Sequence, residues 1–359
     1  MIFCGDFIQF RPVLDTPLYS AWYNTKQNQR GTKRTQNNKE IGMHLWRQVN
    51  HIVLLDEQMR VQDSEYLAML NRLREGKCTD KDVAMVNSRV VGQDVNITSI
   101  ADAPIITPGN QLVMAINDLF VTCQSQHTNV YVSKAKDRLG KDRKVPANIA
   151  CKYKNWACTS TGNLPRELQL YIGMPVIVTT NLRTELGITN GTTGVIKYIH
   201  FKDGEDISED VGVHQLRNQP AYIVVELKDV DVKPLQGLPK NYIPIEPIKK
   251  SFSVGVPGSK NEKVSINRTH FPLVPRFSCT AHKSQGQTLP KAIVDLVPVH
   301  GKTNSVGIEF AYVPLSRVRR LNDLTVLRPF DPAVLKAPVN EGCAAMMEEF
   351  KERDLAKNL

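Results

Sequence analysis

A change in pattern partway along the chain constrains the fold more than any other feature of the sequence. From Met174 to about Pro272, short runs rich in β-branched residues alternate with Gly, Asn, Asp and Pro, and Asn190-Gly191 is a strong turn signal. The β-rich runs lie at 175–180, 194–199, 222–227 and 242–245. Such short strands are typical of a small antiparallel barrel, so the sequence predicts a barrel inserted into an α/β domain.

Helix and strand signals alternate on both sides of this stretch. Apolar residues recur at helical spacing from Asp63 to Glu75, Gly76 follows where a helix-ending glycine is expected, and Thr79 predicts the N-cap of a second helix. Strands are expected at 1–4, 52–55, 104–107 and 324–327, and a charged helix at 341–354. The polar basic stretches 26–39 and 134–154 are interpreted as an exposed loop and an exposed connection.

Size, charge and cysteine content restrict the class of protein. A chain of 359 residues that is 41% hydrophobic can bury more than one core. A net charge of +10 favours a polyanionic partner, nucleic acid rather than membrane, and the alternative is a protein that is merely basic. The seven scattered cysteines indicate a reducing compartment, and Cys151 and Cys158 are too far apart for a metal knuckle. The sequence shows neither a signal-peptide layout nor an apolar run of membrane-spanning length.

Two runs near the C-terminus predict contacts with phosphate. Thr280 to Leu289 combines hydroxyls, a histidine, a lysine and amides around Gly286, directly after an apolar stretch. Such groups suit the binding of phosphate oxygens beside a tight backbone turn. Tyr312 to Arg317 ends in an arginine, the side chain best shaped to reach a transferring phosphoryl group.

Five motifs follow one another in a characteristic order. They are Gly5 to Val13; Leu55 to Arg60 with the later Asp63 and the Leu73-Arg74-Glu75-Gly76 turn; Leu168 to Asn181 with Asn190 to Gly194; Thr280 to Leu289; and Tyr312 to Arg317. In this order they resemble the petite integration frequency (PIF) family of superfamily-one, RecD-like DNA helicases, which move 5′ to 3′. The run from His282 to Thr288 is the most specific of them. The similarity extends from Met1 to about Leu327.

Two positions depart from the family pattern locally. Arg11 stands where the family usually has proline, and Pro314 where it usually has alanine. A proline deep inside a helix costs roughly 3 kcal/mol, and a kink at Pro314 would displace Arg317.

The family's phosphate loop, which ends in Gly-Lys-Ser/Thr, has no clear counterpart. Gly301-Lys302-Thr303 is the nearest match, but Leu296 occupies the position of the required first glycine. Asp56-Glu57 mimics the Mg²⁺-binding acids of the family, but it lies after Gln9, where those acids do not occur. The resemblance therefore implies a C-terminal part of such a helicase, with the phosphate loop and the Mg²⁺ ligands expected from a segment ahead of Met1.

The resemblance also implies a domain plan. The fold class is α/β, a RecA-like parallel-sheet domain of the P-loop NTPase type with an inserted small antiparallel β-barrel, after a truncated first RecA-like domain. Residues 1–50 would be the end of the first RecA-like domain. Residues 51–175 and 273–330 would form the second, 176–272 the inserted barrel, and 331–359 a helical tail.

Catalytic and nucleotide-binding roles carry over from the family motifs. Gln9 would sense the γ-phosphate, and Arg60 and Arg317 would cross an interdomain cleft to stabilise its developing charge. The alternatives are a strand-end glutamine that caps the next turn and an ordinary surface ion pair of Arg317. The full set expected to contact ATP is Gly5, Asp6, Gln9, Arg60, Gly286, Gln287 and Arg317.

Contacts to DNA are expected from the same late motif. Thr280, His282, Lys283 and Ser284 would face the phosphates of a DNA strand and bind it without sequence preference. The alternative for His282 is a neutral histidine satisfied by packing. Single-stranded and forked DNA are the expected partners, with ATP and Mg²⁺ as cofactors, no membrane, and a monomeric protein.

The leading hypothesis is an ATP-dependent DNA helicase that moves 5′ to 3′ on single-stranded DNA, in an incomplete chain. A non-hydrolytic nucleic-acid-binding remnant of a helicase or mobile-element gene is the main alternative. A phosphoryl-transfer enzyme unrelated to nucleic acid fits the charge and the barrel poorly. The resemblance implies an intracellular site, nuclear or mitochondrial, and work in DNA repair, recombination or telomere maintenance, between which the sequence does not choose.

Overall fold

A computed structural model describes most of the chain. The described residues are 2–12, 17–19, 33–49, 51–55, 57–92, 103–140, 143–205, 207, 210–228, 230–259, 262–299 and 306–355. They fall into two compact units: unit 1 is Met1–Gly109 with Cys279–Leu359, and unit 2 is Asn110–Ser278. The expected α/β class is confirmed. The domain boundaries expected at 50, 175, 272 and 330 remain predictions, and the transitions between the compact units lie at 109–110 and 278–279.

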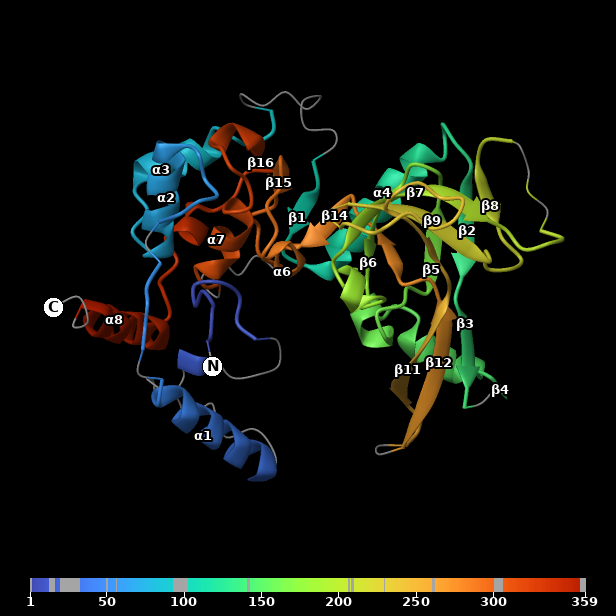
Figure 1. The fold of residues 1–359 in the computed structure, drawn as a ribbon, viewed down its shortest axis with the longest axis horizontal. Coiled ribbons are helices and arrows are strands. Elements are labelled where there is room, and N and C mark those ends of the chain that lie inside the picture. Colours follow the sequence, from blue (N-terminus) through green and yellow to red (C-terminus); the bar gives the residue numbers. More distant parts are fainter. Residues whose placement is uncertain are drawn as a thin grey trace. The chain divides into compact units, whose positions relative to one another are not determined.

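Unit 1 is built on a four-stranded sheet (Figure 1). Its order is β14 (Ser278–Thr280), β1 (Ile105–Thr107), β15 (Ala292–Val294) and β16 (Leu324–Val326). β15 pairs in parallel with both β1 and β16, and every residue of the four strands is buried. Burial on both faces is typical of a parallel sheet covered by helices. The strands expected at 104–107 and 324–327 are therefore present.

Local capping explains where the helices of unit 1 begin and end. The Asp63 side chain caps α2 (Ser64–Arg74) by accepting from two backbone N–H groups, and Gly76 ends the turn at φ +68°. Thr79 and Asp82 form a reciprocal capping box at the start of α3 (Asp80–Asn87). The other helices of unit 1 are α1 (Lys33–Arg47), α6 (Ala281–Ser284), α7 (Glu309–Leu315) and α8 (Glu341–Leu355), with 3₁₀ turns η9 (Leu321–Asp323) and η10 (Pro332–Leu335).

Unit 2 contains the strands predicted from the turn-rich stretch. They form a five-stranded antiparallel sheet in the order β10 (Tyr242–Ile245), β9 (Tyr222–Leu227), β7 (Thr193–His200), β6 (Pro175–Val178) and β13 (Leu273–Pro275). A smaller sheet has the order β5 (Glu167–Leu170), β2 (Val130–Lys134) and β8 (Val213–Gln215). Helix α4 (Asn110–Gln124) contributes Val121 to the core that these strands share. A 3₁₀ turn, η6 (Thr184–Leu186), lies between β6 and β7.

A third sheet of unit 2 forms a separate arm (Figure 1). Its order is β11 (Ile248–Gly255), β12 (Lys263–His270), β3 (Lys136–Leu139) and β4 (Arg143–Lys144). Short helical turns accompany it: α5 (Ala147–Ala150), η4 (Cys151–Tyr153) and η5 (Cys158–Thr161). Ile149, Tyr153, Phe252, Val254 and Ile266 form its own small core. The interpretation of 134–154 as a mere connection was wrong, because much of it is strand and helix in this arm.

Three other expectations need correction. Residues 2–4 are not a buried strand, since Ile2 is 90% exposed and the segment has no strand pairing. Residues 52–55 also form no strand, and Leu55 is 93% exposed, so the apolar run there is not part of the sheet. Part of the expected loop at 26–39 is helical, because α1 begins at Lys33. In the described part of the chain, no helix has the length and apolar character needed to cross a bilayer.

Candidate functional site

Asp6 organises the first motif of unit 1. Its carboxylate accepts two hydrogen bonds of 2.7 Å from the guanidinium of Arg74, a fork-to-fork pair between residues 68 positions apart. It also accepts from the backbone N–H of Ile8 at 3.1 Å and from Gln9 Nε2 at 3.3 Å. The Arg74 Nη1 group donates further to the Tyr312 hydroxyl at 3.2 Å. Asp6 therefore holds Gln9 in place and joins this motif to α2 and α7.

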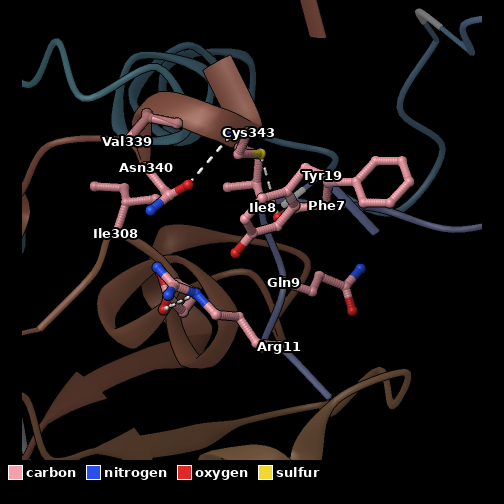
Figure 2. A pocket seen from close by; sticks show the side chains of 10 residues that line it. Phe7, Ile8, Gln9, Arg11, Tyr19, Ile308, Val339, Asn340 and Cys343 are labelled. Atoms are coloured by element: carbon pink, nitrogen blue, oxygen red, sulfur yellow. Dashed lines mark hydrogen bonds and ion pairs between the residues drawn. The ribbon is translucent and has the colours of Figure 1, made fainter. Parts of the chain in front are cut away.

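The side chains that leave this segment point in different directions. Figure 2 shows Gln9 and Arg11 on opposite sides of the chain at a small hollow, whose wall also includes Tyr19, Ile308 and Cys343. Arg11, at the position where the family usually has proline, lies 3.9 Å from the Glu309 carboxylate of α7. Gly5 is exposed and has open space around its Cα. Its expected contact with nucleotide therefore stays a prediction.

The late motif from Thr280 to Leu289 folds as one helical turn followed by a tight bend. Thr280 caps α6, and its hydroxyl accepts from the backbone N–H of Lys283 at 3.4 Å. The Ser284 hydroxyl donates to the Ala281 carbonyl at 2.8 Å, and Ser284 is fully buried. Gly286 then adopts φ +81°, a conformation that favours glycine. Thr280 and Ser284 thus shape the turn, and their burial gives no support to direct contact with DNA phosphates.

His282 and Lys283 lie on the exposed side of the same turn. The His282 ring stacks on Phe10 with centroids 3.9 Å apart and an angle of 15° between the planes. Desolvation lowers the pKa of His282, and the Glu309 carboxylate opposes that change. The imidazole is thus held largely neutral on a surface, beside an exposed ammonium group. This pair remains the part of the expected DNA-binding set that a strand could reach.

Arg60 and Arg317 hold the two late motifs together. Arg60 donates from Nε to Thr288 Oγ1 and from Nη1 to the Ser316 carbonyl, both at 3.0 Å. Arg317 donates from Nη2 to Ser316 Oγ at 2.6 Å and from Nη1 to the Gln287 carbonyl at 3.3 Å. Both arginines therefore bind Ser316, and Arg60 also binds Thr288 whereas Arg317 binds the adjacent Gln287. Their catalytic roles stay predictions.

The Arg317 guanidinium is buried without an acid. Arg317 is 1% exposed, and its Nε donates at 2.7 Å to the Val313 carbonyl, one of those left over at the end of α7. Burial, and then the charge of Arg60, lower the pKa of Arg317 to about 10. Among the described residues, neither Arg60 nor Arg317 has a carboxylate partner. The alternative of an ordinary surface ion pair for Arg317 is therefore wrong.

Pro314 does not displace Arg317 from the site. It lies within α7, and the backbone N–H of Ser316 still reaches the Tyr312 carbonyl at 2.9 Å. The Arg317 N–H bonds to the Pro314 carbonyl at 3.3 Å, so the helix tightens at its end without a break. The anticipated kink is absent.

Several candidates fall outside the site or outside the described residues. Asp56 and the run 301–303 are not among the residues that the structure describes. Gln287 turns its side chain back to the Lys283 carbonyl at 3.0 Å, so only its main chain touches Arg317. Sequence reasoning gave Arg74 no role of its own, although the Leu73–Gly76 turn was part of the resemblance. The signal available was its place in that turn.

Comparison with known proteins finds relatives that match almost the whole chain. No family model matches the chain. The ATP-dependent DNA helicase PIF1 of Xenopus laevis is 27% identical over 339 residues, which cover 94% of this chain and 42% of that protein. The human PIF1 helicase is 24% identical over 342 residues, again 94% of this chain and 41% of that protein. The PIF1 helicase of Saccharomyces cerevisiae is 45% identical over a shorter stretch of 78 residues, which covers 22% of this chain and 8% of that protein.

Solved structures show the same fold. Pif1 helicase from Bacteroides, in complex with ADP-AlF3 and ssDNA, matches 97% of this chain and 66% of its own with a TM-score of 0.61 at 17% identity. Pif1 helicase from Candida albicans matches 82% of this chain and 59% of its own with a TM-score of 0.56 at 22% identity. The resemblance to this family is thereby confirmed. The chain spans less than half the length of the curated relatives named above.

Proposed function

We propose that this chain, which is related to the Pif1 helicases over 94% of its length, is part of an ATP-dependent DNA helicase that moves 5′ to 3′ on single-stranded DNA. One observation carries the proposal: Arg60 and Arg317 bind the same residue, Ser316, and neither has a carboxylate partner among the described residues. Two neighbouring guanidinium groups without acids fit an anion such as a triphosphate. Arginines that face a transferring phosphoryl group are a recurring part of nucleotide motors.

ATP is the proposed nucleotide. The relatives are named ATP-dependent, and one structural neighbour is a complex with ADP-AlF3. Arg60 and Arg317 would stabilise charge on the phosphoryl group, and Gln9, held by Asp6, would sense its presence. The described residues contain no cluster of His, Cys, Asp or Glu that could hold a metal ion. Mg²⁺ is the proposed metal ion, since such ions bridge the phosphates in nucleotide motors.

Single-stranded DNA is the proposed track. One neighbour is a Pif1 bound to ssDNA, and the name of another describes the unwinding of forked dsDNA by two coordinating Pif1 helicases. In this chain the exposed His282 and Lys283 would contact strand phosphates, and Thr280 and Ser284 would keep the turn in shape. A forked substrate, a monomeric protein and a nuclear or mitochondrial site belong to the same proposal.

The catalytic half is tested on a fusion that carries the phosphate loop of a relative. The segment that precedes the matched region in a curated relative is fused ahead of Met1, and ATP hydrolysis is measured with and without single-stranded DNA. We expect DNA-stimulated turnover that falls by about 10³–10⁵ in Arg317→Ala, since that is the contribution of an arginine finger. The chain without the fusion should hydrolyse ATP no faster than its own Arg317→Ala variant.

The DNA half is tested separately. His282→Ala with Lys283→Ala should weaken binding to single strands of any sequence and make its salt dependence shallower. Retained binding together with a fusion that never hydrolyses ATP would favour the non-hydrolytic remnant. Rapid DNA-stimulated hydrolysis by the unfused chain would show that turnover does not depend on the added phosphate loop. Unchanged binding in the double variant would remove this pair from the DNA surface.

A further inference from the structure

The arm of unit 2 has two faces of opposite character. Along β11 and β12 the residues alternate, and the register pairs Phe252 with Ile266 and Val254 with Val264 on one face. That face packs on the helical turns 147–161 and carries the small core of the arm. The residues that alternate with these in β11 and β12 point to the other face. Figure 1 shows β11 and β12 as a long hairpin with β3 beside β12.

The outer face is basic and polar throughout. The register of the four strands places side chains of one kind on it. Its cations are Lys249 of β11, Lys263 of β12, Lys136 and Arg138 of β3, and Lys144 of β4, all exposed. Between them lie Ser251, Ser253, Ser265, Asn267 and Thr269. The described residues of this face include neither an acid nor an aromatic ring. Glu262, which precedes Lys263, is exposed.

Asp137, the acidic residue of β3, lies on the opposite face and pairs with Arg268. Asp137 accepts two hydrogen bonds of 2.8 Å from Arg268, which is 1% exposed. The Arg268 guanidinium lies 5.3 Å from the ring centre of Phe252 and 5.7 Å from that of Tyr153. This buried pair fixes β3 against β12 and removes the carboxylate from the surface.

We propose that the outer face of the β4–β3–β12–β11 sheet binds the sugar–phosphate backbone of duplex DNA. The inference rests on the proposed function for the class of partner and adds a second, distinct contact surface in unit 2. Lysine, arginine and small hydroxyl or amide side chains are the groups that contact phosphate and sugar without reading sequence. Surfaces for single strands add aromatic side chains on which bases stack, and this face has none.

The dimensions agree with a duplex. Four strands at a spacing of about 4.8 Å span about 14 Å, and a duplex carries one phosphate charge for about every 1.7 Å of its axis. About eight phosphates of a duplex therefore lie within the width of the sheet. The phosphates on the side of the duplex that faces the sheet can pair with its cations. Neutralised phosphates release counterions, so the contact must weaken as salt rises.

The test measures binding of the 359-residue chain to a blunt-ended duplex over a series of salt concentrations. The variant carries Lys136→Gln, Lys144→Gln and Lys249→Gln. The control variant carries Lys202→Gln, Lys228→Gln and Lys233→Gln, which change the net charge equally at exposed positions of the same unit outside this face. If each of the three cations neutralises one phosphate, the slope of log K against log salt becomes shallower by about 2.7 in the first variant and stays unchanged in the control.

Single-strand binding by the same variants separates this proposal from the proposed function. We expect the single-strand affinity of the outer-face variant to match that of the unmodified chain, because His282 and Lys283 are intact. Equal losses in the outer-face and control variants would show a general charge effect and overturn the assignment. A loss confined to single strands, or an unchanged duplex slope, would also overturn it. Loss of single-strand binding only in the His282→Ala, Lys283→Ala variant leaves this proposal standing.

Discussion

Replacement of Arg317 by methionine should cost unit 1 about 0–3 kcal/mol of unfolding free energy, although the arginine is 1% exposed. Its two shortest hydrogen bonds, to the Val313 carbonyl and to Ser316 Oγ, stabilise by about 3–6 kcal/mol together. Burial, and then the charge of Arg60, lower the pKa of Arg317 to about 10. One pKa unit is worth about 1.4 kcal/mol, so the charged form is disfavoured by about 3 kcal/mol. The expected cost is the stabilisation by the two hydrogen bonds minus the penalty for burying the charge.

Arg268 provides the matched comparison, because it is equally buried but has a carboxylate partner. Arg268→Met removes both hydrogen bonds that Arg268 donates to Asp137, and removal of one partner from a buried pair costs about 3–5 kcal/mol. Hydrogen–deuterium exchange of the whole chain in increasing denaturant reports each unit through peptides from α7 and β12. A loss in Arg317→Met as large as that in Arg268→Met would refute the reasoning, since Arg317 would then be a structural arginine.

Three further changes have definite expected outcomes. Asp6→Asn should lower the unfolding free energy of unit 1 by about 1–3 kcal/mol in denaturant titration, because Arg74 loses its charged partner; an unchanged midpoint would contradict this. Pro314→Ala should raise the unfolding free energy of unit 1 by up to about 3 kcal/mol in the same assay, because alanine has the backbone N–H that proline cannot donate within α7. A destabilised variant would show that packing of the proline ring matters more. Burial, and then the charge of Arg268, lower the pKa of His270 to about 4, so the unfolded chain takes up the proton first as pH falls. The unfolding free energy of unit 2 should therefore drop by about 3 kcal/mol between pH values of about 6.5 and about 4. His270→Gln should abolish this pH dependence.

Features set by nearby residues could be predicted from the sequence. The caps of α2 and α3 depend on side chains within three positions of the groups that they bind. Thr79 predicted the cap of α3, and Asp63, where the helical spacing begins, is the cap of α2. The strands β6, β7, β9 and β10 were expected from turn residues and β-branched runs, and they occur at the expected places.

Features set by distant partners could not be predicted in this way. β3 and β4 are short and polar, and they are strands because β12 pairs with β3 across more than 120 positions and Arg268 fixes Asp137. The alternation of Lys263 to His270 was the signal that could have indicated a sheet with one exposed face. The role of Arg74 depends on Asp6, far away in sequence. The apolar run 52–55 lacks a pairing partner among the described residues, so its composition alone was misleading.

The late motif links the proposed DNA contact to the proposed nucleotide contact. His282 and Lys283 are exposed on α6, and Gln287 and Thr288, only a few residues later, bind the two arginines. The segment between them has little freedom, because Ser284 is buried and bonded and the backbone N–H of Gln287 donates to the Ser284 carbonyl at 3.1 Å. A shift at either end must therefore move the other. An anion near the arginines would raise the pKa of Arg317, since it would offset the burial and the Arg60 charge that lower it. The energetic gain from nucleotide would then act on the same few residues that present His282 to a strand, and this is the coupling that a translocating motor requires.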